Sequence, residues 1–290
     1  MEKKWTAKLA QNWVLSEISP SYEAGEAQIV SRMLIEWVTG QKAYHWIGGE
    51  SDYLTDNQIQ MIEQLLGRIN TGEPIQYILG ESWFYGRRYG VNPAVLIPRP
   101  ETEEICYQII HHYKQHRGLR ILDAGTGSGC IACALQLELV DSAVWALDVS
   151  ESALNVARNN ARENGAKVTF LENNLLNLQG ALPNDLDLLV SNPPYIPATE
   201  IREMARRVSA YEPHLALFTP DGDPFVFYRQ LSELGKRLLK PGGRIVTEVH
   251  ELYSQGVRAI FEAGGYERVE IRRDMQGKER SVWGEFVSSS

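Results

Sequence analysis

The chain has 290 residues, of which 43% are hydrophobic and 23% charged, and its formal net charge is −8. This composition is ordinary for a globular enzyme with one large domain or two separate cores. It argues against a protein that binds the phosphates of DNA or RNA, because the basic residues include only local pairs and no dense Lys/Arg run.

The N-terminus has no apolar leader, and no apolar run is long enough to cross a bilayer, so we expect a cytoplasmic protein without membrane contact. The three cysteines, Cys106, Cys130 and Cys133, have no spacing typical of a disulfide framework. Cys130 and Cys133 lie three apart, but no second cysteine pair completes a zinc site. We expect buried free thiols and no metal.

Residues 1–80 predict a small all-helical domain. Apolar side chains in a helical spacing precede Gly40, namely Val30, Met33, Leu34, Trp37 and Val38. Thr55 followed by Gln58 is a capping-box pattern that opens a further helix, which Gly72 and Pro74 end. A unit of this kind is more often a packing or recognition module than a catalytic one.

Residues 75–100 mix aromatic side chains with glycines, a composition typical of a short β-hairpin. We expect residues 81–100 to form a hairpin linker to a third segment, residues 101–290. Pro100 suits the first turn of a helix that runs to about His116. That helix carries His111 and His112 as well, but no carboxylate stands at a spacing that indicates a metal site.

From residue 119 onward, strands alternate with helices. The expected strands cover 120–123, 143–148, 168–171, 186–191 and 244–248, and the expected helices include 131–139 and 152–164. This alternation predicts an α/β fold with a doubly wound parallel sheet. Residues 266–273 and 281–287 predict an antiparallel pair at the C-terminal end.

A glycine-rich loop follows the first of these strands: Gly125, Thr126, Gly127, Ser128 and Gly129. Its spacing is G-x-G-x-G, whereas the dinucleotide fingerprint is G-x-G-x-x-G and a P-loop would require a following Gly-Lys-Ser/Thr. Glycines let a ligand approach the backbone closely, and a helix N-terminus follows. The loop alone is a weak signal.

Asp148 strengthens the indication of a nucleotide-binding site. This carboxylate ends the second strand about twenty residues after the glycines, where it can accept hydrogen bonds from ribose hydroxyls. Asp123 could orient the loop or receive the charged amino-acid part of a cofactor. S-adenosylmethionine fits these features better than NAD, since it has ribose and adenine but no pyrophosphate. The alternative for Asp148 is a carboxylate that only caps the next helix.

The stretch Asn192-Pro193-Pro194-Tyr195 follows the strand at 186–191. Two prolines cannot continue a strand, so the chain must turn outward at the carboxyl edge of the sheet. The tetrapeptide recurs in methyltransferases that modify amino groups on planar systems. Taken alone, it is equally compatible with a proline-stiffened loop around a buried tyrosine.

Beside a methyl donor, this stretch predicts transfer to a conjugated nitrogen. The Asn192 side-chain oxygen and the Pro193 carbonyl would accept both N–H hydrogens and direct the nitrogen lone pair toward the S–CH₃ bond. Tyr195 would pack on the planar group. We therefore assign Asn192, Pro193 and Tyr195 to catalysis, the same three with Pro194 to the substrate, and the loop 125–129, Asp148 and Asn192 to the cofactor.

Several segments together resemble the release-factor glutamine N5-methyltransferases, the PrmC/HemK family. The matching segments are residues 72–80, Ile97-Pro98-Arg99-Pro100-Glu101-Thr102-Glu103, the loop 123–129, Asp148, residues 192–196 and the turn with Arg273, Asp274, Gly277 and Arg280. The Ile-Pro-Arg-Pro-Glu-Thr-Glu segment is the most specific of them.

The resemblance implies a Rossmann-like class I S-adenosylmethionine-dependent methyltransferase. Its substrate would be the glutamine of the Gly-Gly-Gln motif in peptide-chain release factors, and residues 1–80 with the hairpin would hold that partner. The family commonly has an Asp and an aromatic residue near the adenine, where this chain has Asn174 and Leu175. The resemblance therefore assigns Asn174 and Leu175 to cofactor binding as well, with adenine packing that is weaker or differently built. The rival interpretations are an adenine N6-methyltransferase acting on DNA or RNA, and a non-catalytic module that keeps the fold.

Overall fold

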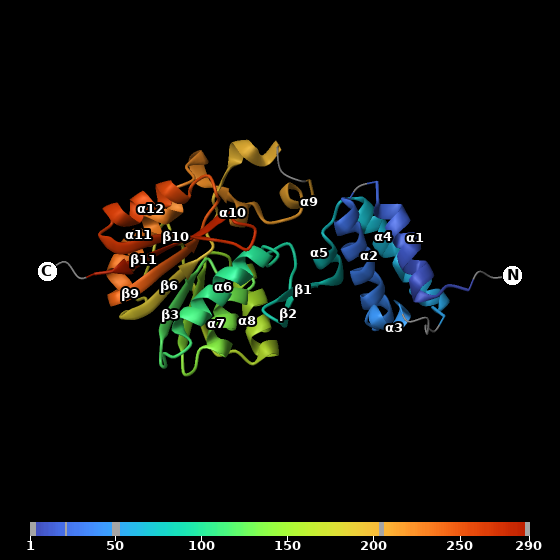
Figure 1. Ribbon diagram of the computed structural model, residues 1–290, viewed down its shortest axis with the longest axis horizontal. Helices are drawn as coiled ribbons and strands as arrows, with labels where there is room; N and C mark the ends of the chain where they lie inside the picture. The colour runs from blue at the N-terminus through green and yellow to red at the C-terminus, as the bar shows by residue number, and fades with distance from the viewer. Residues whose placement is uncertain (1–3, 21, 48–52, 203–205, 288–290) are drawn as a thin grey trace. The chain divides into compact units, whose positions relative to one another are not determined.

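The computed structural model describes residues 4–20, 22–47, 53–202 and 206–287 (Figure 1). The chain divides into two compact units: Met1–Gly80 together with Ala205–Tyr211, and Glu81–Met204 together with Glu212–Ser290. None of the described helices has both the length and the apolar character that a membrane-spanning helix needs.

The first unit is helical. Its helices are α1 (Ala7–Ile18), α2 (Ala24–Thr39), α3 (Tyr44–Ile47), α4 (Asp56–Asn70) and α5 (Ile75–Leu79), with α9 (Arg206–Ser209) from the later segment. The predicted capping box is confirmed, since the Thr55 hydroxyl accepts from Gln58 N and the Gln58 side chain accepts from Thr55 N. The Arg207 guanidinium donates to Glu26 at 2.7 Å.

Residues 75–79 correct one expectation. Four of these five residues are aliphatic or aromatic and lie next to the aromatic hairpin sequence, yet they form the short helix α5, which ends at Gly80 in the left-handed conformation. Ile75, Ile78 and Leu79 pack in the core of the helical unit. The antiparallel pair comes only afterwards, as β1 (Glu81–Phe84) and β2 (Arg87–Gly90).

A seven-stranded sheet organises the second unit. Its order is β10-β11-β9-β6-β3-β4-β5; β9, β6, β3, β4 and β5 are parallel, and β11 pairs antiparallel with both β9 and β10. The strands are β3 (Arg120–Ala124), β4 (Ala143–Asp148), β5 (Val168–Glu172), β6 (Leu186–Ser191), β9 (Leu239–Glu248), β10 (Tyr266–Arg273) and β11 (Glu279–Phe286).

Helices cover both faces of this sheet, as the side-chain alternation along the strands requires. Ile121 and Leu188 face a core shared with α6 (Pro100–Tyr113), α7 (Cys130–Glu138) and α8 (Glu151–Asn164). Leu122 and Leu189, their neighbours in the chain, face a second core with α11 (Val226–Leu238) and α12 (Ser254–Ala263). Figure 1 shows these two helical layers with the sheet between them.

Shorter elements join β6 to α11. They are β7 (Ile196–Pro197), η1 (Ala198–Arg202), α10 (His214–Leu217), β8 (Phe218–Thr219) and η2 (Pro220–Gly222), and β7 pairs in parallel with β8. The predicted doubly wound sheet with an antiparallel C-terminal pair is therefore what the structure contains. Neither α11 nor α12 was predicted from the sequence.

Candidate active site

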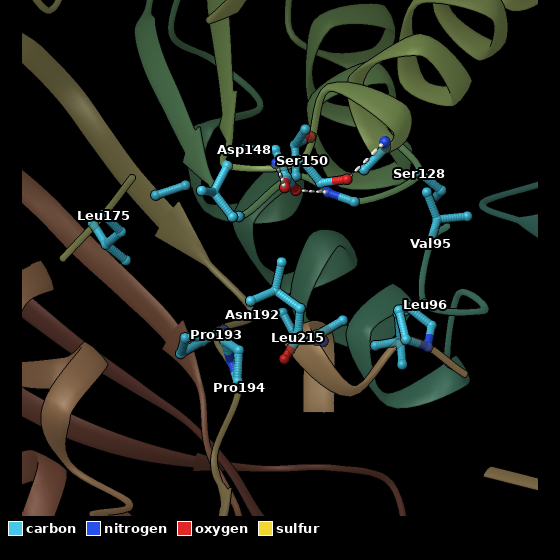
Figure 2. A pocket seen from close by; sticks show the side chains of 18 of the residues that line it. Val95, Leu96, Ser128, Asp148, Ser150, Leu175, Asn192, Pro193, Pro194 and Leu215 are labelled. Carbon is cyan, nitrogen blue, oxygen red and sulfur yellow. Dashed lines mark hydrogen bonds between the residues drawn. The ribbon is translucent and has the colours of Figure 1, made fainter. Parts of the chain in front are cut away.

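A cavity of about 710 Å³ opens at the carboxyl ends of β3, β4 and β6. The strand order reverses between β3 and β6, the position where open α/β sheets hold their ligands. The volume lies in the range of small-molecule and cofactor sites. Figure 2 shows Ser128 and Asp148 on one side of it and Asn192, Pro193 and Pro194 on the other.

The glycine loop forms the floor of this cavity. Gly125 and Gly127 have φ angles of +80° and +54°, values that favour glycine. Gly125 N and Thr126 N both donate to Leu147 O, at 2.7 and 2.9 Å, so the end of β4 holds the loop. Four of the five predicted loop residues line the cavity: Gly125, Thr126, Gly127 and Ser128.

Gly129 does not line the cavity. It precedes α7 with a φ of +79°, and a Cβ built on it would lie 3.0 Å from the Cβ of Ala157. Its role in the structure is to let the loop pack on α8. Asn160, also on α8, is a residue that the sequence analysis missed: its amide donates to Ser128 O at 2.8 Å and to Gly90 O at 3.0 Å.

Asp148 lines the cavity at the end of β4. Its Oδ2 accepts from Gly127 N at 2.8 Å, and its Oδ1 accepts from Ser150 N at 3.0 Å. Burial raises the pKa of the carboxyl, while these backbone hydrogen bonds oppose that shift. Each oxygen keeps a further lone pair, so the carboxylate can accept from a ligand as well as brace the loop.

Asp123 lies behind the loop and is fully buried. Its Oδ2 accepts from the Thr126 hydroxyl at 2.6 Å and from Ala132 N at 3.2 Å, whereas its Oδ1 has no hydrogen-bond partner among the described residues. Burial raises the pKa of Asp123 to about 7. Of its two anticipated roles, the geometry supports the orientation of the loop directly.

Asn192 lines the cavity directly after β6, together with Pro193 and Pro194. Its side-chain Nδ2 donates to the hydroxyl of Thr102 at 3.1 Å. Because the amide nitrogen is engaged in this way, its Oδ1 is the atom left to accept a hydrogen bond from a ligand.

Tyr195 does not line the cavity, although the sequence analysis grouped it with Asn192. Its ring packs against the core on the α11 side of the sheet, and its hydroxyl donates to Glu248 Oε1 at 3.4 Å. Burial raises its pKa. Its predicted contact with a planar substrate group stays a prediction.

Asn174 and Leu175 both line the cavity after β5. Leu175 is buried, and the Asn174 side chain accepts from Leu176 N at 2.9 Å. An aliphatic side chain therefore stands where the family commonly has an aromatic ring.

Residues 93–99 and 213–220 supply further walls of the cavity. Glu212 connects the two segments, since it accepts from the Arg99 guanidinium at 2.5 Å and from Ile97 N at 3.3 Å. The sequence analysis missed Glu212, because nothing local distinguishes it from an exposed glutamate.

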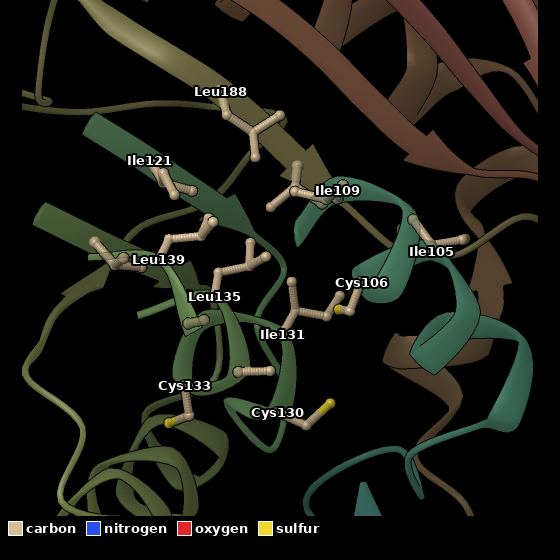
Figure 3. Packing of buried hydrophobic residues seen from close by; sticks show 14 of the residues in the cluster. Ile105, Cys106, Ile109, Ile121, Cys130, Ile131, Cys133, Leu135, Leu139 and Leu188 are labelled. Carbon is tan, nitrogen blue, oxygen red and sulfur yellow. The ribbon is translucent and has the colours of Figure 1, made fainter. Parts of the chain in front are cut away.

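The cysteines are part of the apolar core. Figure 3 shows Cys130 and Cys133 on α7 and Cys106 on α6 among aliphatic side chains. Burial raises the pKa of Cys130 and Cys133 to about 12, so both are neutral thiols at pH 7. Within the described residues, no group of three or more His, Cys, Asp or Glu side chains is arranged to hold a metal ion.

Comparison with known proteins now identifies the family. The chain is 39% identical to the release factor glutamine methyltransferase of Bacteroides thetaiotaomicron, over 92% of this chain and 96% of that protein. It is 33% identical to the protein of the same name from Bacillus subtilis, over 94% and 95%. The chain belongs to the release factor glutamine methyltransferase family.

Two protein-family models match parts of this chain. Residues 10–80 match the PrmC N-terminal domain, and residues 107–210 match the methyltransferase small domain. The family predicted from the sequence is thereby confirmed.

Solved structures give the same fold. A methyltransferase from Pyrococcus furiosus superposes with a TM-score of 0.52 at 18% identity, over 78% of this chain and all of that one. The Thermus thermophilus 16S rRNA N2 G1207 methyltransferase also gives 0.52, at 16% identity, over 71% of this chain and 49% of that one. The predicted Rossmann-like class I methyltransferase fold is confirmed.

Proposed function

We propose that this chain transfers a methyl group from S-adenosylmethionine to the side-chain amide nitrogen of the glutamine in the Gly-Gly-Gln motif of peptide-chain release factors. The observation that carries the proposal is the orientation of Asn192, a residue that lines the cavity: its amide nitrogen donates to Thr102, while its oxygen accepts no hydrogen bond from the described residues. The names of the relatives supply the substrate class.

The cavity fits S-adenosylmethionine. The curved backbone at Gly125 and Gly127 admits close approach, Asp148 has spare acceptor sites for ribose hydroxyls, and Leu175 supplies an apolar wall for the adenine. The Oδ1 of Asp123, which has no hydrogen-bond partner among the described residues, adds a buried polar atom behind the loop. When bound, the cofactor supplies a methyl group on a positively charged sulfur.

The chain's own contribution to the reaction is to position the acceptor. An amide nitrogen is a poor nucleophile while its lone pair is conjugated with the carbonyl. Asn192 Oδ1 and the Pro193 carbonyl would accept hydrogen bonds from its two N–H groups and aim the lone pair at the methyl group, without a strong base or a metal. The proton that the nitrogen loses on methylation would pass to water. The two prolines hold these acceptors on a stiff backbone.

We assign residues 1–80 to recognition of the release factor, residues 81–100 to a hairpin linker, and residues 101–290 to methyl transfer. The match of residues 10–80 to the PrmC N-terminal domain supports a family-specific role for the first segment. A partner that works on the ribosome would place the enzyme in the cytoplasm.

A label-transfer assay tests the proposal. Purified release factor, DNA and RNA are each incubated with the enzyme and methyl-labelled S-adenosylmethionine. Label in the release factor alone, lost when its Gly-Gly-Gln glutamine is replaced by alanine, supports the proposal. Label in DNA or RNA alone would favour the adenine N6-methyltransferase instead, and label in none of the three would favour a non-catalytic module.

A further inference from the structure

Two hydrogen bonds join three side chains, those of Asn192, Thr102 and Glu248, into a network that begins at the cavity. Thr102 lies in the first turn of α6 and is buried. Its hydroxyl accepts from Asn192 Nδ2 at 3.1 Å and donates to Glu248 Oε2 at 2.5 Å. Glu248 ends β9, so its carboxylate lies at the same carboxyl edge of the sheet as Asn192.

While Glu248 is ionised, the donors and acceptors of this three-residue network can be matched in only one way. A carboxylate has no proton to give, and a threonine hydroxyl has one. The Thr102 hydroxyl must therefore donate its one hydrogen bond to the Glu248 carboxylate, and it can only accept a hydrogen bond from Asn192. Asn192 must then direct its NH₂ toward Thr102 and its oxygen away from it.

The opposite orientation would be harmful to the reaction. It would place the Asn192 NH₂, a donor, against the N–H hydrogens of the target amide, leaving donors on both sides unsatisfied. Asparagine alone does not fix its own rotation, since its oxygen and nitrogen ends have nearly the same shape. Some neighbour has to distinguish them, and Thr102 is the neighbour that bonds the nitrogen.

The C-terminal hairpin completes the arrangement. Arg280 on β11 lies beside the end of β9, since Val249 N donates to Arg280 O at 2.9 Å, and its Nε donates to Asp274 Oδ2 at 3.2 Å. Asp274 in turn accepts from Gln276 N at 3.0 Å and Lys278 N at 2.9 Å, which fixes the turn between β10 and β11. The turn that carried part of the family resemblance therefore lies beside the strand end that carries Glu248.

We propose that Thr102 and Glu248 are positioning residues that hold the Asn192 amide with its oxygen toward the substrate. The inference rests on the proposed function and deepens it, because it states what makes the site an acceptor of N–H hydrogens. Neither residue needs to touch the substrate.

Protonation of Glu248 should make the orientation of the Asn192 amide depend on pH. Burial raises its pKa to about 7, and the negative charge of Glu101 adds to this, while Thr102, Arg280 and Tyr195 oppose it. Two further titratable neighbours have raised pKa values and are neutral at pH 7, Cys106 on α6 and Tyr228 on α11. A protonated Glu248 could donate to Thr102, whose proton would then be free to turn toward Asn192 and release the amide.

The test compares Thr102→Val with Thr102→Ser and with Thr247→Val as a matched control. Thr247 is an equally buried threonine whose hydroxyl bonds Glu248 O at 3.1 Å and does not reach Asn192. Single-turnover methylation of the release factor is measured at saturating S-adenosylmethionine, with cofactor affinity and thermal stability recorded for each variant.

We expect Thr102→Val to slow transfer by about 100-fold, the cost of a misplaced reacting group, with cofactor affinity retained. Thr102→Ser should recover most of the rate, and Thr247→Val should stay close to the wild type. Equal rates for the two valine variants, or a serine variant as slow as Thr102→Val, would overturn the inference. Failure of the proposed function is distinct, since the wild type itself would then transfer nothing.

The pH profile supplies a second readout. For the wild type the single-turnover rate should fall as the pH decreases through about 7, the value to which burial raises the pKa of Glu248. Glu248→Gln should be slower than the wild type at pH 8 but lose this dependence, because glutamine cannot be protonated there. The same fall in both proteins would contradict the assignment.

Discussion

Arg99 and Glu212 form an ion pair of 2.5 Å between residues 113 positions apart in the chain. The Glu212 side chain is only 1% exposed and that of Arg99 33% exposed. Loss of Arg99 would leave a buried carboxylate uncompensated, whereas loss of Glu212 would leave a cation that can reach water. Arg99→Met should therefore lower the free energy of unfolding more than Glu212→Gln, by up to about 3–5 kcal/mol.

Urea denaturation of the two variants measures this difference. Both should also weaken cofactor binding, since the pair joins two walls of the cavity. Equal destabilisation by the two substitutions would show that burial of the carboxylate is not what makes the pair matter.

Replacement of Asn192 by alanine removes the acceptor for the target N–H while leaving the loop and Asp148 intact. We expect methyl transfer to fall by about 100-fold or more, with the affinity for S-adenosylmethionine, measured by calorimetry, within a few-fold of the wild type. Full activity of Asn192→Ala would refute the proposed mechanism.

Gly129 and Gly165 offer a matched pair of glycine substitutions. Both have positive φ, +79° and +73°, but only Gly129 would bring a Cβ within 4 Å of other atoms, those of Ala157. Gly165→Ala should cost about 1–2 kcal/mol for the left-handed backbone alone. Gly129→Ala should cost more and also weaken cofactor binding. Equal losses in thermal unfolding would mean that the packing on α8 is unimportant.

Asp123 should make stability depend on pH. Burial raises its pKa from 3.8 to about 7, so the folded state binds a proton more tightly than the unfolded state. The stabilising contribution is therefore fully present below about pH 3.8 and is lost as the pH rises through about 7. When the pH is raised from 5 to 8, the free energy of unfolding measured by urea titration should fall less for Asp123→Asn than for the wild type. Identical losses would contradict this account.

The parallel strands were predictable because each is a short apolar run with a clear end. The expected strands at 143–148 and 186–191 coincide with β4 and β6, and the prolines after Ser191 end β6 as expected. The helix at 75–79 was not predicted, because a segment of five residues beside a hairpin is too short to show a helical period. Helix α11 was missed although its buried side chains, Leu231, Leu234 and Leu238, follow a helical spacing.

The local parts of the candidate site were also predictable. The glycine loop, Asp148 and Asn192 each stand at the end of an apolar strand, which is a signal the sequence carries. Thr102 and Glu248 are joined across 146 residues, and only the fold brings them together. A signal existed for both: Thr102 lies in the segment that carried the family resemblance, and Glu248 ends a predicted strand.

Mass spectrometry of the release factor after reaction with the enzyme tests the central claim most directly. The account predicts a gain of one methyl group on the peptide that carries Gly-Gly-Gln, with fragment ions that locate it on the glutamine side chain, and no gain when Asn192→Ala replaces the wild-type enzyme. A methyl group on any other residue, or an unmodified glutamine where nucleic acid is methylated, would contradict the account.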